Sequence, residues 1–345
     1  MTEVKYIGAD VHSSSSFLVV LENSGEVWDK RRLPTTEKDL SVYLEGIPGR
    51  KIIAFEETNL ARWLYQVFTS AVDEVVVCNP AKNTFTKNGP KTDGQDALHL
   101  ARLLKAGYLK PVYHGDDPRE QFRDLVSAYR DVIQDIVRLK NRYKALFRAE
   151  GTPLGKGQMV YKMEELQKQL KSREKSFIAR GVYERLRALE TQREAFLAEM
   201  KVRSRSFKEV RILRSIPGID YIHAWTLVAY MVTPWRFANK YKFWSYCGLV
   251  KHKQISDGKV YGNKKAHGNN ALKDVFRKAG LAAIRGTSGL RAYYDHLRLN
   301  GEVSHGPAYN AVCREVAALV RTLWKKGEKY NDGEYRKSKN LSHPT

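Results

Sequence analysis

The sequence predicts an α/β domain at the N-terminus, a long helical region in the middle and a mainly helical C-terminal domain. Up to residue 116, apolar runs of strand length alternate with amphipathic helical patterns. Apolar residues then repeat three and four positions apart without a break from Phe122 to Leu146, as in a coiled coil. After residue 207 they recur mainly at helical spacing. We therefore expect four segments, at residues 1–116, 117–207, 208–326 and, as a charged tail expected to be disordered, 327–345.

The N-terminal domain is expected to begin with three strands and to continue with alternating helices and strands. In chain order we expect strands over 4–12, 17–22 and 27–33, a helix from Thr36, a strand up to Glu56, a helix near 60–70 and a strand over 74–78. This is the order of an RNase H-like domain, in which acidic side chains from a first strand, a later strand and a following helix converge. Fold alone would not establish the function of such a domain.

Four acidic side chains stand where apolar strands end or a helix begins. Asp10 and Glu56 each end an apolar run of strand length. Thr92 predicts a helix N-cap, which places Asp93 and Asp96 in the first turn and on one face. Acidic side chains in the first turn of a helix can be there only because they interact favourably with the helix dipole. Acids at the ends of buried strands, however, are costly unless they are paired or bound to a metal.

Convergence of these four carboxylates would require protons or a cation. Two like charges 4 Å apart repel by about 4 kcal/mol at an effective dielectric constant of about 20. Hard oxygen ligands favour Mg²⁺, with Mn²⁺ as the alternative. Two such ions about 3.5–4 Å apart could activate one oxygen and stabilise the leaving oxygen in phosphodiester chemistry.

The net charge of +22 is distributed unevenly along the chain. Residues 1–116 carry 14 basic and 15 acidic side chains, whereas the other 229 residues carry 46 and 23. This asymmetry predicts a chemical module joined to a polyanion-binding body. We see no signal peptide and no apolar run long enough to span a membrane. The three cysteines have no metal-ligand spacing, so we expect a reduced, cytoplasmic protein.

The middle and C-terminal regions are predicted to be helical, with a basic loop between helices. A second helical region, roughly 161–205, could pair with the heptad helix as a hairpin or with another subunit. The Pro217-Gly218 turn could present backbone amides to a phosphate or be an ordinary turn. Residues 251–259 form a basic, turn-rich loop, in which Ser256-Asp257-Gly258 by itself predicts a turn. Helices are expected near 272–284 and 308–324.

Several motifs carry a resemblance to a known family. In the N-terminal half they are Tyr6-Ile7-Gly8-Ala9-Asp10, Phe55-Glu56-Glu57-Thr58, Asn79-Pro80 and Lys91-Thr92-Asp93-Gly94-Gln95-Asp96-Ala97. In the C-terminal half they are Ser215-Ile216-Pro217-Gly218-Ile219, Tyr246-Cys247-Gly248-Leu249 and the loop with Ser256, Gly258 and Gly262 before Gly268-Asn269. Together these motifs resemble the DEDD transposases of bacterial insertion sequences, a family that includes pilin-gene invertases and bridge-RNA-guided recombinases.

The resemblance implies a role for five residues. Asp10, Glu56, Asp93 and Asp96 would be the metal-binding tetrad, and Ser256 would attack a DNA phosphodiester and become covalently joined to the strand. Asp257 follows Ser256 where a small residue is expected, and its charge could hinder a phosphate or bind metal. Transfer of a phosphodiester to serine and then to a new DNA end keeps the number of ester bonds constant, so no nucleotide hydrolysis is required.

The resemblance also implies partners. Family members recognise a structured guide RNA that pairs with donor and target DNA, and they assemble homo-oligomers, here a dimer or a tetramer, acting on the nucleoid. Specificity would then be delegated to base pairing. The alternatives are a metal-dependent junction nuclease that uses water, a site-specific invertase without a guide RNA, and a non-catalytic RNA-binding scaffold.

Overall fold

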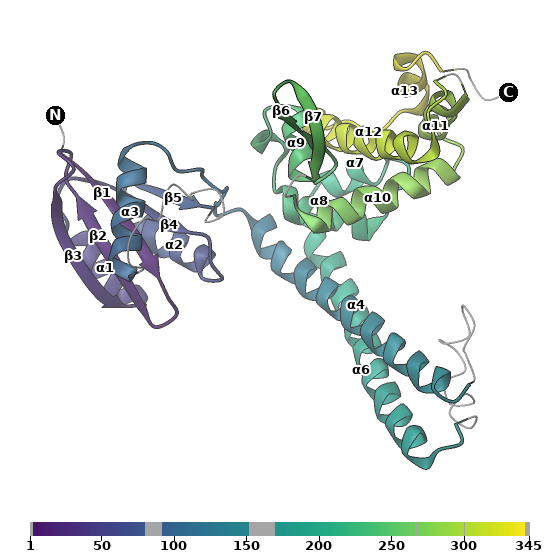
Figure 1. Cartoon of the computed structure of the whole chain (residues 1–345), viewed down its shortest axis with the longest axis horizontal. Coiled ribbons are helices and arrows are strands. Elements are labelled where there is room, and N and C mark those ends of the chain that lie inside the picture. The colour runs from purple at the N-terminus through teal and green to yellow at the C-terminus, as the bar shows by residue number, and fades with distance from the viewer. Residues whose placement is uncertain (1–2, 80–91, 152–169, 266–267, 300, 342–345) are drawn as a thin grey trace. The chain divides into compact units, whose positions relative to one another are not determined.

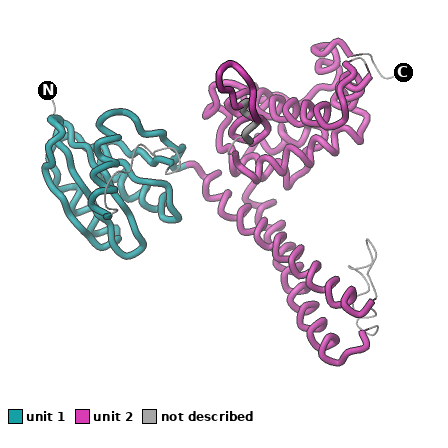
Figure 2. The backbone as a smooth tube through the Cα atoms, viewed as in Figure 1, with its two compact units in different colours: residues 1–116 teal, residues 117–345 magenta. Residues whose placement is uncertain are grey.

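The chain folds into two compact units, residues 1–116 and 117–345 (Figure 2). The computed structural model describes residues 3–79, 92–151, 170–265, 268–299 and 301–341. Within these ranges, no helix combines the length and the apolar character needed to cross a membrane.

The first unit is built on a mixed five-stranded sheet with strand order β3-β2-β1-β4-β5 (Figure 1). Its strands are β1 (Val4–Val11), β2 (Ser15–Leu21), β3 (Val27–Pro34), β4 (Arg50–Glu56) and β5 (Glu74–Cys78). β1 pairs with β2, and β2 with β3, in antiparallel fashion, whereas β4 is parallel to both β1 and β5. The predicted α/β order is confirmed, and the strand order is consistent with an RNase H-like domain.

Helices cover both faces of this sheet because each strand alternates its side chains between the two faces. Helices α1 (Glu37–Glu45) and α2 (Ala61–Ala71) pack on the face that carries Ile7, Ala9, Ile53 and Phe55. Helix α3 (Asp93–Lys105) packs on the other face, through Ala97 and Ala101 against β2 and through Leu100 against Ala54. The predicted N-caps are confirmed, since Thr36 accepts a hydrogen bond from the Asp39 amide and Thr92 from the Gln95 amide.

Gly8 lets α3 approach β1 closely. A Cβ atom at this position would lie 2.0 Å from the carbonyl oxygen of Ala97 and 2.5 Å from the amide nitrogen of Ala101. Both are backbone atoms of α3, so neither can move aside as a side chain can. A glycine in β1 therefore sets the distance between the strand that ends near Asp10 and the helix that begins at Asp93.

The second unit begins with a pair of long helices, α4 (Pro118–Arg148) and α6 (Arg173–Arg203). The predicted heptad residues from Val132 to Tyr143 share a core cluster with Ala179 and Leu186 of α6. Phe122 and Tyr129, earlier in the same pattern, join the core of the C-terminal helical domain. Lys140 and Glu190 form an ion pair of 3.2 Å between the two helices. Of the two pairings left open by the sequence, the structure has the intrachain hairpin (Figure 1). Coiled-coil geometry stays a prediction, and the predicted helical residues 161–169 lie outside the described ranges.

The rest of the second unit is a helical domain around one large core. In chain order it contains η2 (Ser204–Ser206), α7 (Glu209–Leu213), α8 (Tyr221–Met231), η3 (Pro234–Arg236), α9 (Lys240–Tyr246), β6 (Lys251–Ser256), β7 (Lys259–Lys265), α10 (Asn270–Arg285), α11 (Gly289–Leu299), α12 (His305–Lys326) and α13 (Asp332–Ser338). The carboxylate of Asp220 accepts a hydrogen bond of 2.7 Å from the His223 amide at the start of α8. The N-terminus of α8 is thus capped by an anionic side chain, which favours the ordinary turn over a phosphate site at Pro217-Gly218.

Two expectations about this unit are wrong. The loop predicted at 251–259 is most of an antiparallel β-hairpin, because β6 and β7 pair from Lys251–Lys265 to Ser256–Lys259. The tail predicted to be disordered contains helix α13, which Asn331 caps through the Glu334 amide. Tyr335 of α13 is buried in the main core.

Candidate active site

Asp10 and Glu56 lie side by side at the ends of neighbouring parallel strands. Ala9 of β1 is paired with Phe55 of β4, so each acid stands one residue beyond that pair. Because side chains alternate along a strand, both acids share the sheet face of Gly8, the face that α3 covers. Asp10 and Glu56 are both partly buried.

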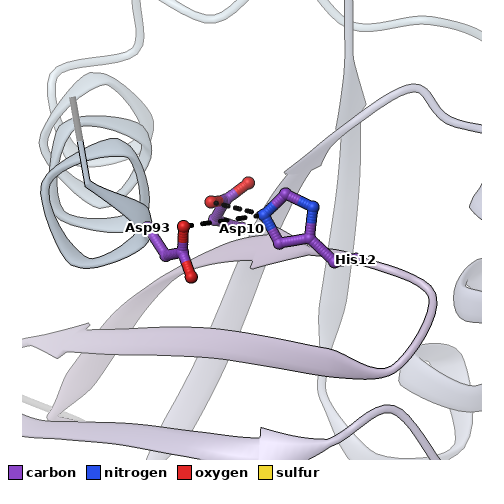
Figure 3. Close-up of side chains that lie close together, drawn as sticks. All are labelled: Asp10, His12 and Asp93. Atoms are coloured by element: carbon purple, nitrogen blue, oxygen red, sulfur yellow. Dashed lines mark ion pairs between the residues drawn. The ribbon is translucent and has the colours of Figure 1, made fainter.

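Helix α3 begins at the same end of the sheet and contributes Asp93 and Asp96 from its first turn. The side chain of Asp93 lies close to Asp10 and to His12, the residue after β1 (Figure 3). His12 Nε2 is 3.4 Å from Asp10 Oδ2 and 3.7 Å from Asp93 Oδ1. One potential ligand atom from each of these three residues lies within 4.8 Å of the other two.

The electrostatics of this cluster centre on Asp10. Burial raises the pKa of Asp10 above its ordinary value, His12 opposes this rise, and the negative charges of Asp96 and Asp93 add to it. Asp96 thus acts on the same carboxylate as Asp93. Three carboxylates whose negative charges act on one another favour the binding of a cation.

Two side chains already partner Asp93. Arg32, from β3, donates a hydrogen bond of 2.5 Å from Nη2 to Asp93 Oδ2, while His12 faces the other carboxylate oxygen. Glu57, next to Glu56, belongs to a different contact, since its Oε1 lies 3.7 Å from Nε2 of the buried His114. The choice of Glu56 over Glu57 for the tetrad stays a prediction, since the potential ligand atoms grouped at this site come from Asp10, His12 and Asp93.

Ser256 lies in the second unit, at the exposed end of the β6–β7 hairpin. Asp257 and Gly258 form its two-residue loop with φ angles of 49° and 71°. Positive φ at both positions is typical of a type I′ turn, in which Asp-Gly is a favoured pair. Asp257 is thus explained by the turn that it makes.

Comparisons with known proteins assign both units to one family. Residues 7–150 match a family model of DEDD, IS110-type proteins described as "Transposase". Residues 210–295 match a second model, described as "Transposase IS116/IS110/IS902 family". The chain belongs to the IS110-type DEDD transposases. The two matched segments of this DEDD transposase contain all five residues that its motifs single out.

A curated relative of the transposase comes from Sinorhizobium fredii and is named "Putative transposase y4qE". It is 25% identical over 252 residues, which are 71% of this chain. The match spans 63% of the length of that relative.

The donor set of this DEDD transposase fits a divalent metal ion. Asp10 and Asp93 offer carboxylate oxygens, the hard ligands that Mg²⁺ and Mn²⁺ prefer, and His12 adds an imidazole nitrogen. Burial is the main cause of the raised pKa of Asp10, and a bound cation would relieve the repulsion from Asp96 and Asp93 that adds to it.

His12 is a member of this cluster that the sequence reasoning missed. Its signal was the spacing Asp10-Val11-His12, since residues two apart on a strand share a face.

Proposed function

We propose that this chain is a DNA recombinase of an insertion sequence, which cuts and rejoins DNA strands by phosphodiester transesterification. The observation that carries the proposal is the convergence of Asp10 and Asp93, from β1 and the start of α3, in a chain whose two units both match IS110-type transposases. Asp10, Glu56, Asp93 and Asp96 are proposed as metal ligands. Ser256 is proposed as the nucleophile.

The proposed cofactor is Mg²⁺, with Mn²⁺ as an alternative. A divalent ion at this site would supply Lewis-acid polarisation of a phosphate oxygen. The chain's own part is to hold the ligands in place: β1 and β4 fix Asp10 and Glu56 in register, and α3 presents Asp93 and Asp96. His12 is an additional ligand in this proposal, and its nitrogen makes Mn²⁺ a closer fit than an all-oxygen site would.

The proposed covalent step conserves ester bonds. The Ser256 hydroxyl oxygen forms a bond to phosphorus as the bond from phosphorus to one sugar oxygen breaks. The proton that leaves the serine is balanced by the proton that the departing sugar oxygen gains. A hydroxyl of a new DNA end then reverses the step and releases Ser256. The exposure of Ser256 at a hairpin tip supports this role, because a phosphodiester can reach it.

The partners we propose are donor and target DNA, a structured guide RNA and further copies of the chain in a dimer or tetramer. The net charge of the second unit supports binding of nucleic acid. We propose that residues 1–116 hold the metal, that 117–207 form a helical, coiled-coil connection and that 208–326 carry Ser256. Such an enzyme would act where its DNA lies, on the bacterial nucleoid.

The proposal is tested by trapping the serine adduct. The full chain is incubated with DNA that carries the element's ends, with co-purified RNA and Mg²⁺, and then denatured. We expect a protein–DNA adduct that Ser256→Ala abolishes. Ser206→Ala, which removes another exposed serine of the second unit, is the matched control and should keep the adduct.

Other outcomes select the alternatives. If Ser256→Ala recombines DNA at the normal rate, Ser256 is not the nucleophile. Hydrolysed ends without an adduct would select a metal-dependent junction nuclease. Recombination that needs no co-purified RNA would select a site-specific invertase. If the chain binds neither Mg²⁺ nor Mn²⁺ in a titration, the remaining alternative is a non-catalytic RNA-binding scaffold.

A further inference from the structure

A strip of cations and aromatic rings runs along one side of the C-terminal helical domain. We call it the basic-aromatic seam and define it by α12 residues Arg314, Arg321 and Lys325 together with Trp235, Lys240, Tyr241 and Trp244. The α12 residues stand at positions i, i+7 and i+11, which share one face of a helix and span about 16 Å. Each of them contacts the segment that runs from η3 to α9.

The contacts are cation–π and charge-assisted hydrogen bonds. Lys325 Nζ lies 4.3 Å from the centre of the Trp235 ring, and the Arg314 guanidinium lies 6.0 Å from that of Trp244. Between them, Arg321 donates a hydrogen bond of 2.7 Å to the Phe237 carbonyl oxygen. Lys240 Nζ is 5.4 Å from the centre of the Tyr241 ring and 5.6 Å from that of Trp244.

Two of the rings remain open to solvent. Trp235 is 70% exposed and Tyr241 is 63% exposed, although both are large aromatic side chains. A ring has two faces, and Lys325 lies over only one face of Trp235. The segment is also free of opposing charge, because no Asp or Glu occurs in residues 221–256.

We propose that the basic-aromatic seam binds a single-stranded stretch of nucleic acid, with unpaired bases stacked on Trp235 and Tyr241 and phosphates facing Lys240, Arg314 and Lys325. The inference rests on the proposed function for the presence of nucleic acid. Exposed aromatic faces between cations are what a single strand requires, since every unpaired base has a face to stack and each phosphate carries a negative charge. A duplex keeps its bases stacked on one another and would use only the cations.

The seam is close in sequence to the proposed nucleophile. Helix α9 ends at Tyr246 and β6, which leads to Ser256, begins at Lys251. Residues 247–250 alone join α9 to that strand. A strand held on the seam would therefore be unpaired next to the hairpin that presents Ser256.

The test is binding of labelled oligonucleotides to the full chain, followed by fluorescence anisotropy. Single-stranded DNA and single-stranded RNA of about 12 nucleotides, within the usual site sizes of about 4–16, are compared with a duplex of the same length. We expect Trp235→Ala to weaken single-strand binding by about tenfold and duplex binding by less than about twofold. Trp235→Phe keeps a ring and should retain most of the affinity.

Matched controls separate stacking from general effects. Phe177→Ala removes another ring that is highly exposed, on α6, and should leave single-strand binding unchanged. Lys325→Ala should weaken both single strand and duplex, whereas Lys278→Ala, which removes an exposed lysine of α10, should weaken neither by more than about twofold. The melting temperature of Trp235→Ala should stay near that of the parent, because the side chain is mostly exposed.

Opposite results overturn the proposal. Equal losses for single strand and duplex in Trp235→Ala, or no loss for either, would show that the ring does not stack on bases. Photo-crosslinking of the bound strand only to residues outside both 234–244 and 314–325 would do the same. A preference for RNA over DNA would identify the guide as the occupant, and the reverse would identify a DNA strand. Since binding is measured without recombination, adduct formation by Ser256 can fail or succeed independently.

Discussion

At the scale of the residue, Asp10 stands in an environment that opposes its charge. Its pKa is raised in the folded state, chiefly by burial, so ionised Asp10 lowers the free energy of unfolding once the pH exceeds that raised pKa. Below the ordinary pKa of an aspartate the carboxyl is protonated in both states, and this destabilisation disappears. A metal ion bound at pH 7 would reverse it, because it stabilises only the folded chain.

Asp10→Asn should therefore have opposite effects with and without metal. In a chelator at pH 7, we expect the variant to melt above the parent, with a difference that shrinks towards about pH 4. With Mn²⁺ at about 100 times its dissociation constant, the free energy of unfolding should rise by about 2.7 kcal/mol in the parent and by little in the variant. Calorimetric melting temperatures give both comparisons. Glu57→Gln, beside the tetrad but in contact with His114, is the control, and Mn²⁺ should raise its melting temperature as much as that of the parent. If Mn²⁺ raises the melting temperatures of the parent and of Asp10→Asn equally, Asp10 is not a metal ligand.

The residues at this site differ in how well the sequence predicted them. Asp10 and Asp93 stood out because a buried strand end and a helix start are unfavourable or distinctive places for acids. His12 did not, since a single histidine after a strand has many ordinary roles. Asp257 looked out of place beside Ser256 until the structure gave it a positive φ angle, which an Asp-Gly turn requires and sequence alone does not reveal.

At the scale of the element, the distance between β1 and α3 decides whether the acids meet. Gly8→Ala would drive a Cβ atom into backbone atoms of Ala97 and Ala101, and relief requires α3 to move. We expect a loss of about 3 kcal/mol or more in the free energy of unfolding, at the upper end for overpacking, and weaker metal binding because Asp93 moves with the helix. Denaturant melts and Mn²⁺ titration measure the two effects.

Gly46→Ala is the control for this prediction. It lies in the same unit, at the end of α1, with an ordinary helical backbone and no atom closer than 3.5 Å to an added Cβ. Its stability and metal affinity should match the parent. If a folded Gly8→Ala chain binds metal as tightly as the parent, metal binding does not depend on the position of α3.

Helix α13 offers a second test at this scale, because the sequence predicted disorder there. Tyr335 is only 6% exposed, and its hydroxyl has no hydrogen-bond partner among the described residues. Tyr335→Ala should cost about 3–5 kcal/mol of stability, whereas Tyr335→Phe should be neutral or stabilising since it removes an unpaired buried hydroxyl. Lys337→Ala, exposed on the same helix, should change little. Denaturant unfolding that gives the same stability for Tyr335→Ala and the parent would mean that α13 does not dock.

The elements that were predicted well are those with a strong periodic pattern. The strands that carry Asp10 and Glu56 have apolar centres, Tyr6-Ile7-Gly8-Ala9 and Ile52-Ile53-Ala54-Phe55, and α4 repeats its apolar positions from Phe122 to Leu146. The β6–β7 hairpin was missed because it is rich in lysine and exposes Ile255 and Val260, so no apolar face marks it. Helix α13 was missed because one buried tyrosine in a charged segment is too weak a pattern to predict packing.

At the scale of the whole molecule, charge is separated between the two units. The first unit is nearly neutral and carries the acids, while the second carries the excess of lysine and arginine together with Ser256. The acids of the proposed metal site repel the phosphates of nucleic acid, so the attraction for nucleic acid has to come from positive charge elsewhere in the chain. In the proposed function, the second unit supplies this positive charge, and a metal ion would neutralise the acids of the first unit.

This separation predicts a steep dependence of nucleic-acid binding on salt. Each phosphate that a lysine or arginine neutralises releases counterions, and a protein with about 6–10 such contacts loses about 10³- to 10⁵-fold in affinity between about 50 and about 200 mM salt. We expect a loss in this range for the full chain with RNA or DNA, measured by anisotropy at several salt concentrations. Asp10→Asn should leave the slope of the logarithmic plot unchanged, since the tetrad lies outside the basic unit, whereas Lys325→Ala should reduce it by about one contact. An affinity that stays flat over this range would mean that the excess charge of the second unit does not bind phosphates.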